Sequence, residues 1–289
     1  MNNILGAIDP IAFSFGTLEV YWYGIIIAAG IFIAIFLSTR EAEKRGIEGD
    51  HIVDMALWAI PLAFIGARLY YVLFELGYYL ENPSQIIAIW NGGIAIYGGL
   101  IAGGLTVYWY TKKKGIPIWL MLDILAPNVL LAQAMGRWGN FMNQEAHGGE
   151  VTRSFLENLF LPDFIINQME INGVYYHPTF LYESLWSLLG FILIVVLRNK
   201  KHLLRQGEVA LSYVIWYAFG RFFIEGLRTD SLWLFDFIRV SQALSLMLFI
   251  GAISLWVYRR RDYPPVPYYS DGMNQPKNKK SSQNKKRND

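Results

Sequence analysis

The segment Gly136–Glu145 holds the densest group of polar side chains in an otherwise apolar part of the chain. It reads GRWGNFMNQE and combines the guanidinium of Arg137 with the amide of Asn140 and the carboxylate of Glu145. A guanidinium binds phosphate oxygens through paired hydrogen bonds, and an amide adds a further donor and acceptor. A group of this composition at the end of an apolar run is suited to bind an anionic phosphate ester.

Two further arginines, Arg68 and Arg221, lie inside apolar runs, where a charge is costly and tends to mark a functional cavity. With a rise of about 1.5 Å per helical residue, Arg68 lies about 24 Å and Arg221 about 20 Å beyond the start of its run. Each also has a structural interpretation. Arg221 could neutralise Glu225 four residues later, and Arg68 could pair with Glu75 or a neighbouring helix.

The composition places these side chains in a membrane protein. Of the 289 residues, 54% are hydrophobic and 17% are charged, whereas about a quarter of the residues are charged in soluble domains. The 16% of aromatic residues argues against a disordered chain. Because the chain has no cysteine, it has no disulfide, no thiolate nucleophile and no cysteine-ligated zinc. No metal-ligand cluster is visible, and we expect neither a metal nor a cofactor.

The apolar residues fall into runs that are long enough to cross a bilayer as helices. There are seven of them, at about Val20–Ser38, Ile52–Phe74, Ile94–Tyr110, Pro117–Met135, Thr179–Leu197, Glu208–Ile224 and Val240–Tyr258. We therefore predict an all-α polytopic membrane protein with seven transmembrane helices over residues 20–258. The longest polar interval, residues 137–178, is predicted to form a small extracytoplasmic cap.

Basic residues are distributed unevenly between the two sides that these runs define. Of the 25 Lys and Arg residues, 19, including every lysine, lie after the first, third, fifth and seventh runs. The positive-inside rule places those segments in the cytoplasm, so the N-terminus is outside and the C-terminus inside. Residues 1–19 are then an exterior interfacial segment. Residues 259–289 are predicted to be a disordered basic tail near anionic headgroups, an interpretation that we favour over nucleic-acid binding.

This orientation brings the polar groups of several runs to one depth. Arg68, Arg137 and Arg221 all lie in the outer third of the membrane, at the level of the outer-leaflet headgroups. Tyr23 and Tyr97 lie near the outer ends of the first and third runs, and His177 directly precedes the fifth. The convergence of such groups from different runs is what favours a functional cavity over separate structural roles.

The motifs that carry these residues resemble those of bacterial prolipoprotein diacylglyceryl transferases from about residue 10 to residue 260. Besides Gly136–Glu145 they are Trp22-Tyr23-Gly24, Gly66-Ala67-Arg68, Gly92-Gly93 through Gly98-Gly99, His177-Pro178 with Leu181-Tyr182-Glu183, and Tyr217 with Arg221, Glu225 and Arg228. The resemblance implies an enzyme of the bacterial cytoplasmic membrane. Such an enzyme transfers the sn-1,2-diacylglyceryl group of phosphatidylglycerol to the lipobox cysteine thiol of a prolipoprotein signal peptide, forming a thioether and releasing glycerol phosphate.

The resemblance also implies roles for individual residues. Those expected in catalysis are Arg137, Arg221, Tyr97, Glu145 and His177. Those expected to bind phosphatidylglycerol are Arg137, Arg221, Asn140, Tyr23, Arg68, Gly98 and Glu225. Fixed positive charge would stabilise the departing phosphate, and it would favour the thiolate, since an unperturbed thiol has a pKa near 8.5.

The sequence does not identify the general base that accepts the thiol proton. Some family members carry histidine where this chain has Tyr97, and a phenol with a pKa near 10 is mostly protonated at neutral pH. Tyr97 is therefore better suited to donate a hydrogen bond, and Glu145, His177 or the lipid phosphate could accept the thiol proton instead.

Two other functions fit the composition. A transporter or flippase of an anionic lipid would use the same arginines, but it would need polar groups that continue to the inner leaflet, where Asp54 and Asp123 are the only candidates. A seven-helix receptor or assembly protein would have no use for an intramembrane group of arginines.

Overall fold

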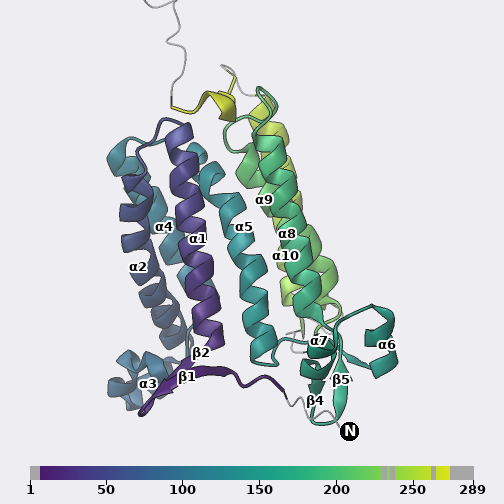
Figure 1. Ribbon diagram of the computed structural model, residues 1–289. Coiled ribbons are helices and arrows are strands. Elements are labelled where there is room, and N and C mark those ends of the chain that lie inside the picture. Colours follow the sequence, from purple (N-terminus) through teal and green to yellow (C-terminus); the bar gives the residue numbers. More distant parts are fainter. Residues whose placement is uncertain (1–6, 230–232, 235–237, 262–264, 274–289) are drawn as a thin grey trace, which may run out of the picture. The chain divides into compact units, whose positions relative to one another are not determined.

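Long helices make up most of the computed structural model, which describes residues 7–229, 233–234, 238–261 and 265–273 (Figure 1). Seven helices of at least 18 residues lie in this part of the chain, and each overlaps one of the predicted apolar runs. They are α1 (Trp22–Lys44), α2 (Asp50–Phe74), α4 (Ile96–Lys114), α5 (Ile118–Met142), α8 (Thr179–Arg198), α9 (Glu208–Glu225) and α10 (Val240–Arg260).

Five of these helices, namely α1, α2, α5, α8 and α10, are long and apolar enough to cross a membrane. The exceptions are α4, which is rich in glycine and ends in three lysines, and α9, which contains Glu208, Arg221 and Glu225. The chain is therefore a multi-pass membrane protein, and the crossing of all seven helices stays a prediction.

By internal contacts the chain divides into two compact units, residues 1–37 with 123–270, and residues 38–122 with 271–289. In the first unit α1 approaches α5 closely. A Cβ added at Gly30 would lie 3.6 Å from Ala132, and one added at Gly139 would lie 2.7 Å from the ring of Tyr23. Small residues therefore let the two backbones come together, as is common between membrane helices.

In the second unit α2 packs against α4 along a line of small residues. A Cβ at Gly98 would overlap the backbone of Gly66, and a Cβ at Gly99 would lie 3.4 Å from the carbonyl oxygen of Ala63. The segment between the two helices contains α3 (Leu76–Glu81) and two short 3₁₀ helices, η1 (Pro83–Ile87) and η2 (Ile89–Asn91).

The residues after α5 form a small α/β region rather than part of an all-α fold. Three short antiparallel strands pair in the order β3 (Glu150–Val151), β5 (Val174–Tyr176) and β4 (Glu170–Ile171), and α6 (Arg153–Asn158) and α7 (Asp163–Gln168) lie between β3 and β4 in the chain. Asn172 and Gly173 join β4 to β5 with positive φ angles of 53° and 83°. An Asn-Gly pair is typical of such tight hairpin turns.

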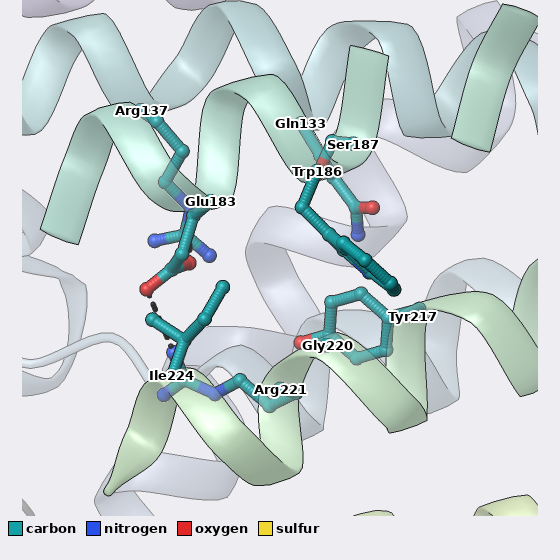
Figure 2. A pocket seen from close by; sticks show the side chains of 9 residues that line it. All are labelled: Gln133, Arg137, Glu183, Trp186, Ser187, Tyr217, Gly220, Arg221 and Ile224. Atoms are coloured by element: carbon teal, nitrogen blue, oxygen red, sulfur yellow. Dashed lines mark hydrogen bonds and ion pairs between the residues drawn. The ribbon is translucent and has the colours of Figure 1, made fainter. Parts of the chain in front are cut away.

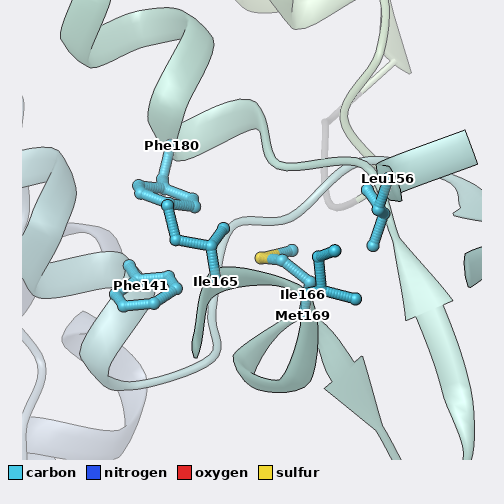
Figure 3. Close-up of a cluster of buried hydrophobic side chains, with 6 residues drawn as sticks. All are labelled: Phe141, Leu156, Ile165, Ile166, Met169 and Phe180. Carbon is cyan, nitrogen blue, oxygen red and sulfur yellow. The ribbon is translucent and has the colours of Figure 1, made fainter. Parts of the chain in front are cut away.

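A hydrophobic cluster holds this region to the ends of α5 and α8 (Figure 3). It consists of Phe141, Leu156, Ile165, Ile166, Met169 and Phe180. Full burial of a side chain of this kind contributes about 1.5–3 kcal/mol when the alternative is exposure to water. Such a core is typical of a segment that folds in water.

A second departure from an all-α fold precedes α1. Strands β1 (Ile11–Phe15) and β2 (Leu18–Tyr21) form an antiparallel hairpin whose turn includes Gly16 at a φ of +61°. The apolar side chains of Phe13, Phe15 and Leu18 are exposed on it. The segment leading into the hairpin is held by Gln168, whose Oε1 accepts a hydrogen bond from the backbone N–H of Ile8 at 2.7 Å.

The basic tail differs from the predicted disordered segment. Helix α10 continues to Arg260, and residues 265–273 are folded. Tyr269 is completely buried, and its backbone N–H donates to the carbonyl of Leu204 at 2.8 Å. Tyr268 forms a β-bridge with Arg205. The polar composition of this segment gives no sign of these contacts, because a single buried aromatic residue changes the composition very little. Residues 262–264 and 274–289 lie outside the described part.

Candidate active site

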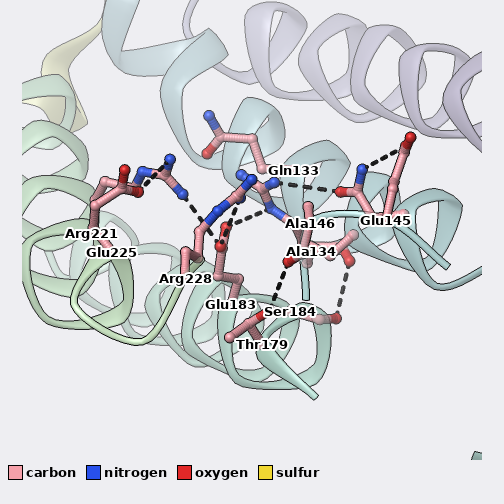
Figure 4. Close-up of polar contacts among 12 residues, drawn as sticks. Gln133, Ala134, Glu145, Ala146, Thr179, Glu183, Ser184, Arg221, Glu225 and Arg228 are labelled. Carbon is pink, nitrogen blue, oxygen red and sulfur yellow. Dashed lines mark hydrogen bonds and ion pairs between the residues drawn. The ribbon is translucent and has the colours of Figure 1, made fainter. Parts of the chain in front are cut away.

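One carboxylate, that of Glu183 near the start of α8, is the centre of an arginine cluster (Figure 4). Its Oε2 lies 2.6 Å from Nε of Arg137, and its Oε1 lies 3.2 Å from Nη1 of Arg221 and 3.6 Å from Nη1 of Arg228. Glu183 is buried, with 7% of its surface exposed. The carboxylate thus brings three guanidiniums to one buried point, and Arg137 and Arg221 reach it from two different helices.

Arg221 is held from its own helix as well. Its Nη2 lies 2.6 Å from Oε2 of Glu225, one turn later on α9. The pairing of Arg221 with Glu225 that the spacing suggested is thus present, and it coexists with the contact to Glu183. Two carboxylates fix the guanidinium plane, which orients its donors before any ligand binds.

The polar segment after Arg137 forms a chain of hydrogen bonds. Nη1 of Arg137 donates to Oδ1 of Asn140 at 3.4 Å, and Nδ2 of Asn140 donates to Oε1 of Glu145 at 2.9 Å. Glu145 also accepts from Nδ2 of Asn143 at 3.4 Å and is exposed. The structure therefore connects Arg137, Asn140 and Glu145, three of the residues that the sequence indicated.

The start of α8 is attached to α5, which fixes Glu183 relative to Arg137. The hydroxyl of Ser184 donates to the carbonyl of Ala134 at 2.9 Å and accepts from Nε1 of Trp138 at 3.2 Å. The hydroxyl of Thr179 donates to the carbonyl of Ala146 at 2.7 Å.

A pocket opens beside the arginine cluster (Figure 2). Its lining residues are Gln133, Arg137, Glu183, Trp186, Ser187, Tyr217, Gly220, Arg221 and Ile224. Its cavity volume is about 20 Å³, and it is open on one side. Arg137 and Arg221 both reach Glu183 at this pocket, one from α5 and the other from α9, so an anion within it could contact both guanidiniums.

His177 lies at the entrance to α8, apart from the pocket lining. Its Nδ1 is 3.4 Å from the hydroxyl of Tyr182, and its ring packs edge-on against Phe155 at a centroid distance of 4.8 Å. Burial lowers the pKa of His177 below its usual value of 6.5. The imidazole is therefore neutral at neutral pH, the state in which it can accept a proton.

A short backbone connection links His177 to the arginine cluster. Gly148 donates to the carbonyl of His177 at 3.0 Å, and Gly149 donates to the carbonyl of Leu227 at 3.2 Å. Gly148 also forms a β-bridge with Arg228. A Cβ at Gly148 would come within 2.6 Å of the His177 Cβ, so only glycine fits between these segments.

The remaining predicted residues divide between the two units. Tyr23 belongs to the first unit and covers Gly139, two residues after Arg137. Arg68, Tyr97 and Gly98 belong to the second unit. Tyr97 stands in the first turn of α4, and its side chain is exposed. Gly98 provides the close approach of α4 to α2, which gives it a packing role.

Arg68 is fully engaged with backbone carbonyls. Its Nε donates to Ile86, its Nη1 to Gly92 and Gly93, and its Nη2 to Gln85 and Ala88, over distances of 2.6–3.4 Å. All five N–H donors of the guanidinium have an acceptor. This geometry favours the structural interpretation, in which Arg68 orders the segment between α2 and α4.

Glu183 and Arg228 stand in the recognised motifs, but the sequence reasoning gave neither a role. Glu183 follows Tyr182 in an apolar helix, so it was visible only as a buried charge without a local partner. Arg221 is 38 residues away from it in the chain, and no periodicity connects the two.

Comparisons with known proteins agree on one family. The profile described as prolipoprotein diacylglyceryl transferase matches residues 10–258. A phosphatidylglycerol–prolipoprotein diacylglyceryl transferase of Lactiplantibacillus plantarum is 56% identical over 275 residues, covering 95% of this chain and 98% of that protein. A protein of the same name from Listeria welshimeri is 56% identical over 271 residues, covering 94% and 96%. The chain therefore belongs to the prolipoprotein diacylglyceryl transferase family.

Proposed function

We propose that this protein transfers the sn-1,2-diacylglyceryl group of phosphatidylglycerol to the thiol of a lipobox cysteine in a prolipoprotein. The observation that carries the proposal is the group of guanidiniums on one buried carboxylate beside an open pocket. A phosphodiester has the charge and the oxygen geometry that such a group binds. The family membership supplies the reaction class, and the names of the relatives contain both substrates.

In the proposed reaction the cysteine sulfur attacks the glycerol carbon that carries the phosphate. A sulfur–carbon bond forms, the carbon–oxygen bond breaks, and the electron pair leaves with the phosphate oxygen as glycerol phosphate. Arg137 and Arg221 stabilise the charge that develops on this leaving group. They also favour the thiolate over the thiol, since nearby positive charge lowers a thiol pKa.

The thiol proton has three candidate acceptors in this protein. His177 is neutral because of its burial, Glu145 is an exposed carboxylate bound to Asn140, and Tyr97 is an exposed phenol. We propose the first two as bases and Tyr97 as a hydrogen-bond donor to the headgroup, because a phenol is a poor base at neutral pH.

The geometry favours transfer over transport of an anionic lipid. The two acidic groups that could continue a polar path to the other leaflet are both engaged in the structure. Asp123 accepts hydrogen bonds from the backbone N–H groups of Gly207 and Ala210 at 2.6 and 2.8 Å, and it thereby caps the start of α9. Asp54 accepts a long hydrogen bond from Tyr110 at 3.5 Å.

Donor selectivity tests the proposed function directly. Purified protein is incubated with a lipobox peptide and vesicles of either phosphatidylglycerol or phosphatidylcholine, and the peptide is weighed by mass spectrometry. We expect the diacylglyceryl mass increment with phosphatidylglycerol and none with phosphatidylcholine, whose quaternary ammonium would lie beside the guanidiniums. Equal modification with both lipids would contradict an arginine-lined headgroup site.

The orientation in the membrane has its own test. We propose that the arginine cluster faces the outer leaflet, with residues 1–19 and 137–178 outside and every lysine inside. An amine reagent that cannot cross the membrane should then label no lysine side chain in intact cells and should label them after lysis. Labelling of Lys112–Lys114 from outside would reverse the orientation and remove the outer-leaflet site.

A further inference from the structure

Helices α8 and α9 carry the same spacing, a tryptophan followed by a glycine four residues later. The pairs are Trp186 with Gly190 and Trp216 with Gly220. Each indole lies against the glycine of the other helix. A Cβ at Gly190 would overlap Nε1 of Trp216, and a Cβ at Gly220 would overlap Nε1 of Trp186. We refer to these four residues as the tryptophan clasp.

The contact is reciprocal in its hydrogen bonds as well. Nε1 of Trp186 donates to the carbonyl of Trp216 at 3.0 Å, and Nε1 of Trp216 donates to the carbonyl of Trp186 at 2.9 Å. The two rings are stacked with centroids 4.2 Å apart and planes 12° apart. Both tryptophans are half-buried, and in this alignment of the two helices each indole N–H has its acceptor on the other helix.

The alignment has a consequence for the arginine cluster. Glu183 stands one turn before Trp186 on α8, and Arg221 directly follows Gly220 on α9. A slip of one helical turn would move one relative to the other by about 5.4 Å. Their ion pair of 3.2 Å would then be lost. The alignment set by the clasp is therefore the one in which Arg221 reaches the carboxylate that Arg137 also binds.

The two halves of the clasp differ in their relation to the pocket. Trp186 and Gly220 are among its lining residues (Figure 2), whereas Trp216 and Gly190 are not. A change at Trp216 or Gly190 therefore tests the alignment of the helices without removing an atom from the pocket wall.

We propose that the tryptophan clasp positions Arg221 against Glu183 and Arg137, and that its four members are positioning residues for the transfer reaction. The inference rests on the proposed function. A misplacement of about 1 Å in a preorganised site typically costs about 10²-fold in rate. Separation of α8 from α9 by one methyl group is a displacement of that order.

The decisive variants are Gly190→Ala and Trp216→Phe, in the half remote from the pocket. Alanine is a better helix former than glycine, so a loss in Gly190→Ala must come from the overlap with the indole. We expect kcat for peptide modification to fall by about 10-fold or more, with a smaller rise in KM for phosphatidylglycerol, because Arg221 contacts the phosphate of the bound lipid but stabilises the leaving charge only in the transition state. Gly251→Ala on α10 is the matched control, since a Cβ there meets open space.

A rescue experiment separates alignment from general damage. The smaller ring in Trp216→Phe leaves room for a methyl group at position 190, so the double variant Gly190→Ala/Trp216→Phe should be more active than Gly190→Ala alone. The crossed double variant Gly190→Ala/Trp186→Phe relieves no overlap and should show no recovery. If Gly190→Ala does not accumulate, the activity of Trp216→Phe tests the inference instead, because this variant adds no atom that could overlap with its neighbours.

The inference is overturned if Trp216→Phe and Gly190→Ala keep the kcat of the wild type, or if only the thermal stability falls. An effect confined to Trp186→Phe would also overturn it, since that pattern indicates direct contact with substrate in the pocket. If the wild type itself transfers nothing to the peptide, the proposed function fails and the inference with it.

Discussion

Glu183→Gln is expected to lower diacylglyceryl transfer by about 10²-fold or more, because removing one member of a buried ion pair is strongly disruptive. Glutamine keeps the volume of the side chain but replaces one acceptor oxygen by a donor nitrogen. That nitrogen would face a guanidinium of Arg137 or Arg221, the two arginines now 2.6 and 3.2 Å from the carboxylate. At least one guanidinium must turn away from the pocket. The measurement is transfer of labelled lipid to a lipobox peptide in membranes with matched protein levels.

Glu157→Gln provides the matched control. Glu157 pairs with Arg153 at 2.8 Å in the region after α5, but the two side chains are 51% and 44% exposed. An exposed pair contributes about 0–1 kcal/mol, so this variant should transfer at the rate of the wild type. Activity of Glu183→Gln within threefold of the wild type would show that the carboxylate does not organise the arginines.

The second large effect is expected for Arg137→Lys and for Arg221→Lys. Lysine keeps the charge but lacks the planar pair of donors. Loss of one preorganised donor in an active site typically costs about 10²–10³-fold in rate, so each variant should lose most of its activity while still inserting and accumulating. Tyr97→Phe removes only a hydroxyl from an exposed ring, 42% of whose residue surface is accessible. It should retain clearly more activity than either arginine variant.

Arg153→Lys is the control for the arginine variants, because Arg153 is exposed and bound to Glu157 outside the pocket. It should behave as the wild type in the same transfer assay. An inactive Tyr97→Phe together with a nearly normal Arg137→Lys would reverse the assigned roles and make the Tyr97 phenolate the leading base.

The positions of the long helices were predictable because each is encoded by a local run of apolar residues. The ends of the helices were less predictable, because hydropathy identifies the residues that lie in lipid and a helix can continue beyond them. Helix α5 continues past the expected end at Met135 to Met142. Arg137 and Asn140 therefore lie on one helical face, three residues apart, which explains their hydrogen bond.

The arginines and the Asn140–Glu145 segment could be picked out from residue type, because a charge in an apolar run is costly and usually has a functional or structural role. The arrangement around Glu183 could not be predicted in this way, since it depends on contacts between three helices that are distant in the chain. Arg68 shows how little residue type says about a side chain's partners. Its type allowed both an anion site and a structural role, and its hydrogen-bond acceptors are backbone carbonyls, which residue type does not single out.

The glycine connection between His177 and Arg228 bears on how the protein is assembled during synthesis. Gly148 and Gly149 emerge from the ribosome well before α9, yet their backbone partners Leu227 and Arg228 follow that helix. The backbone of Gly148 and Gly149 therefore lacks these partners until α9 has been synthesised, and extended backbone with unpaired hydrogen-bonding groups can pair wrongly. The arginine cluster is completed only when the end of α9 arrives. A nascent chain that stops before Leu227 would hold Arg137, Glu183 and Arg221 but would lack Arg228 and the backbone partner of Gly149, so the cluster closes only at a late stage of synthesis.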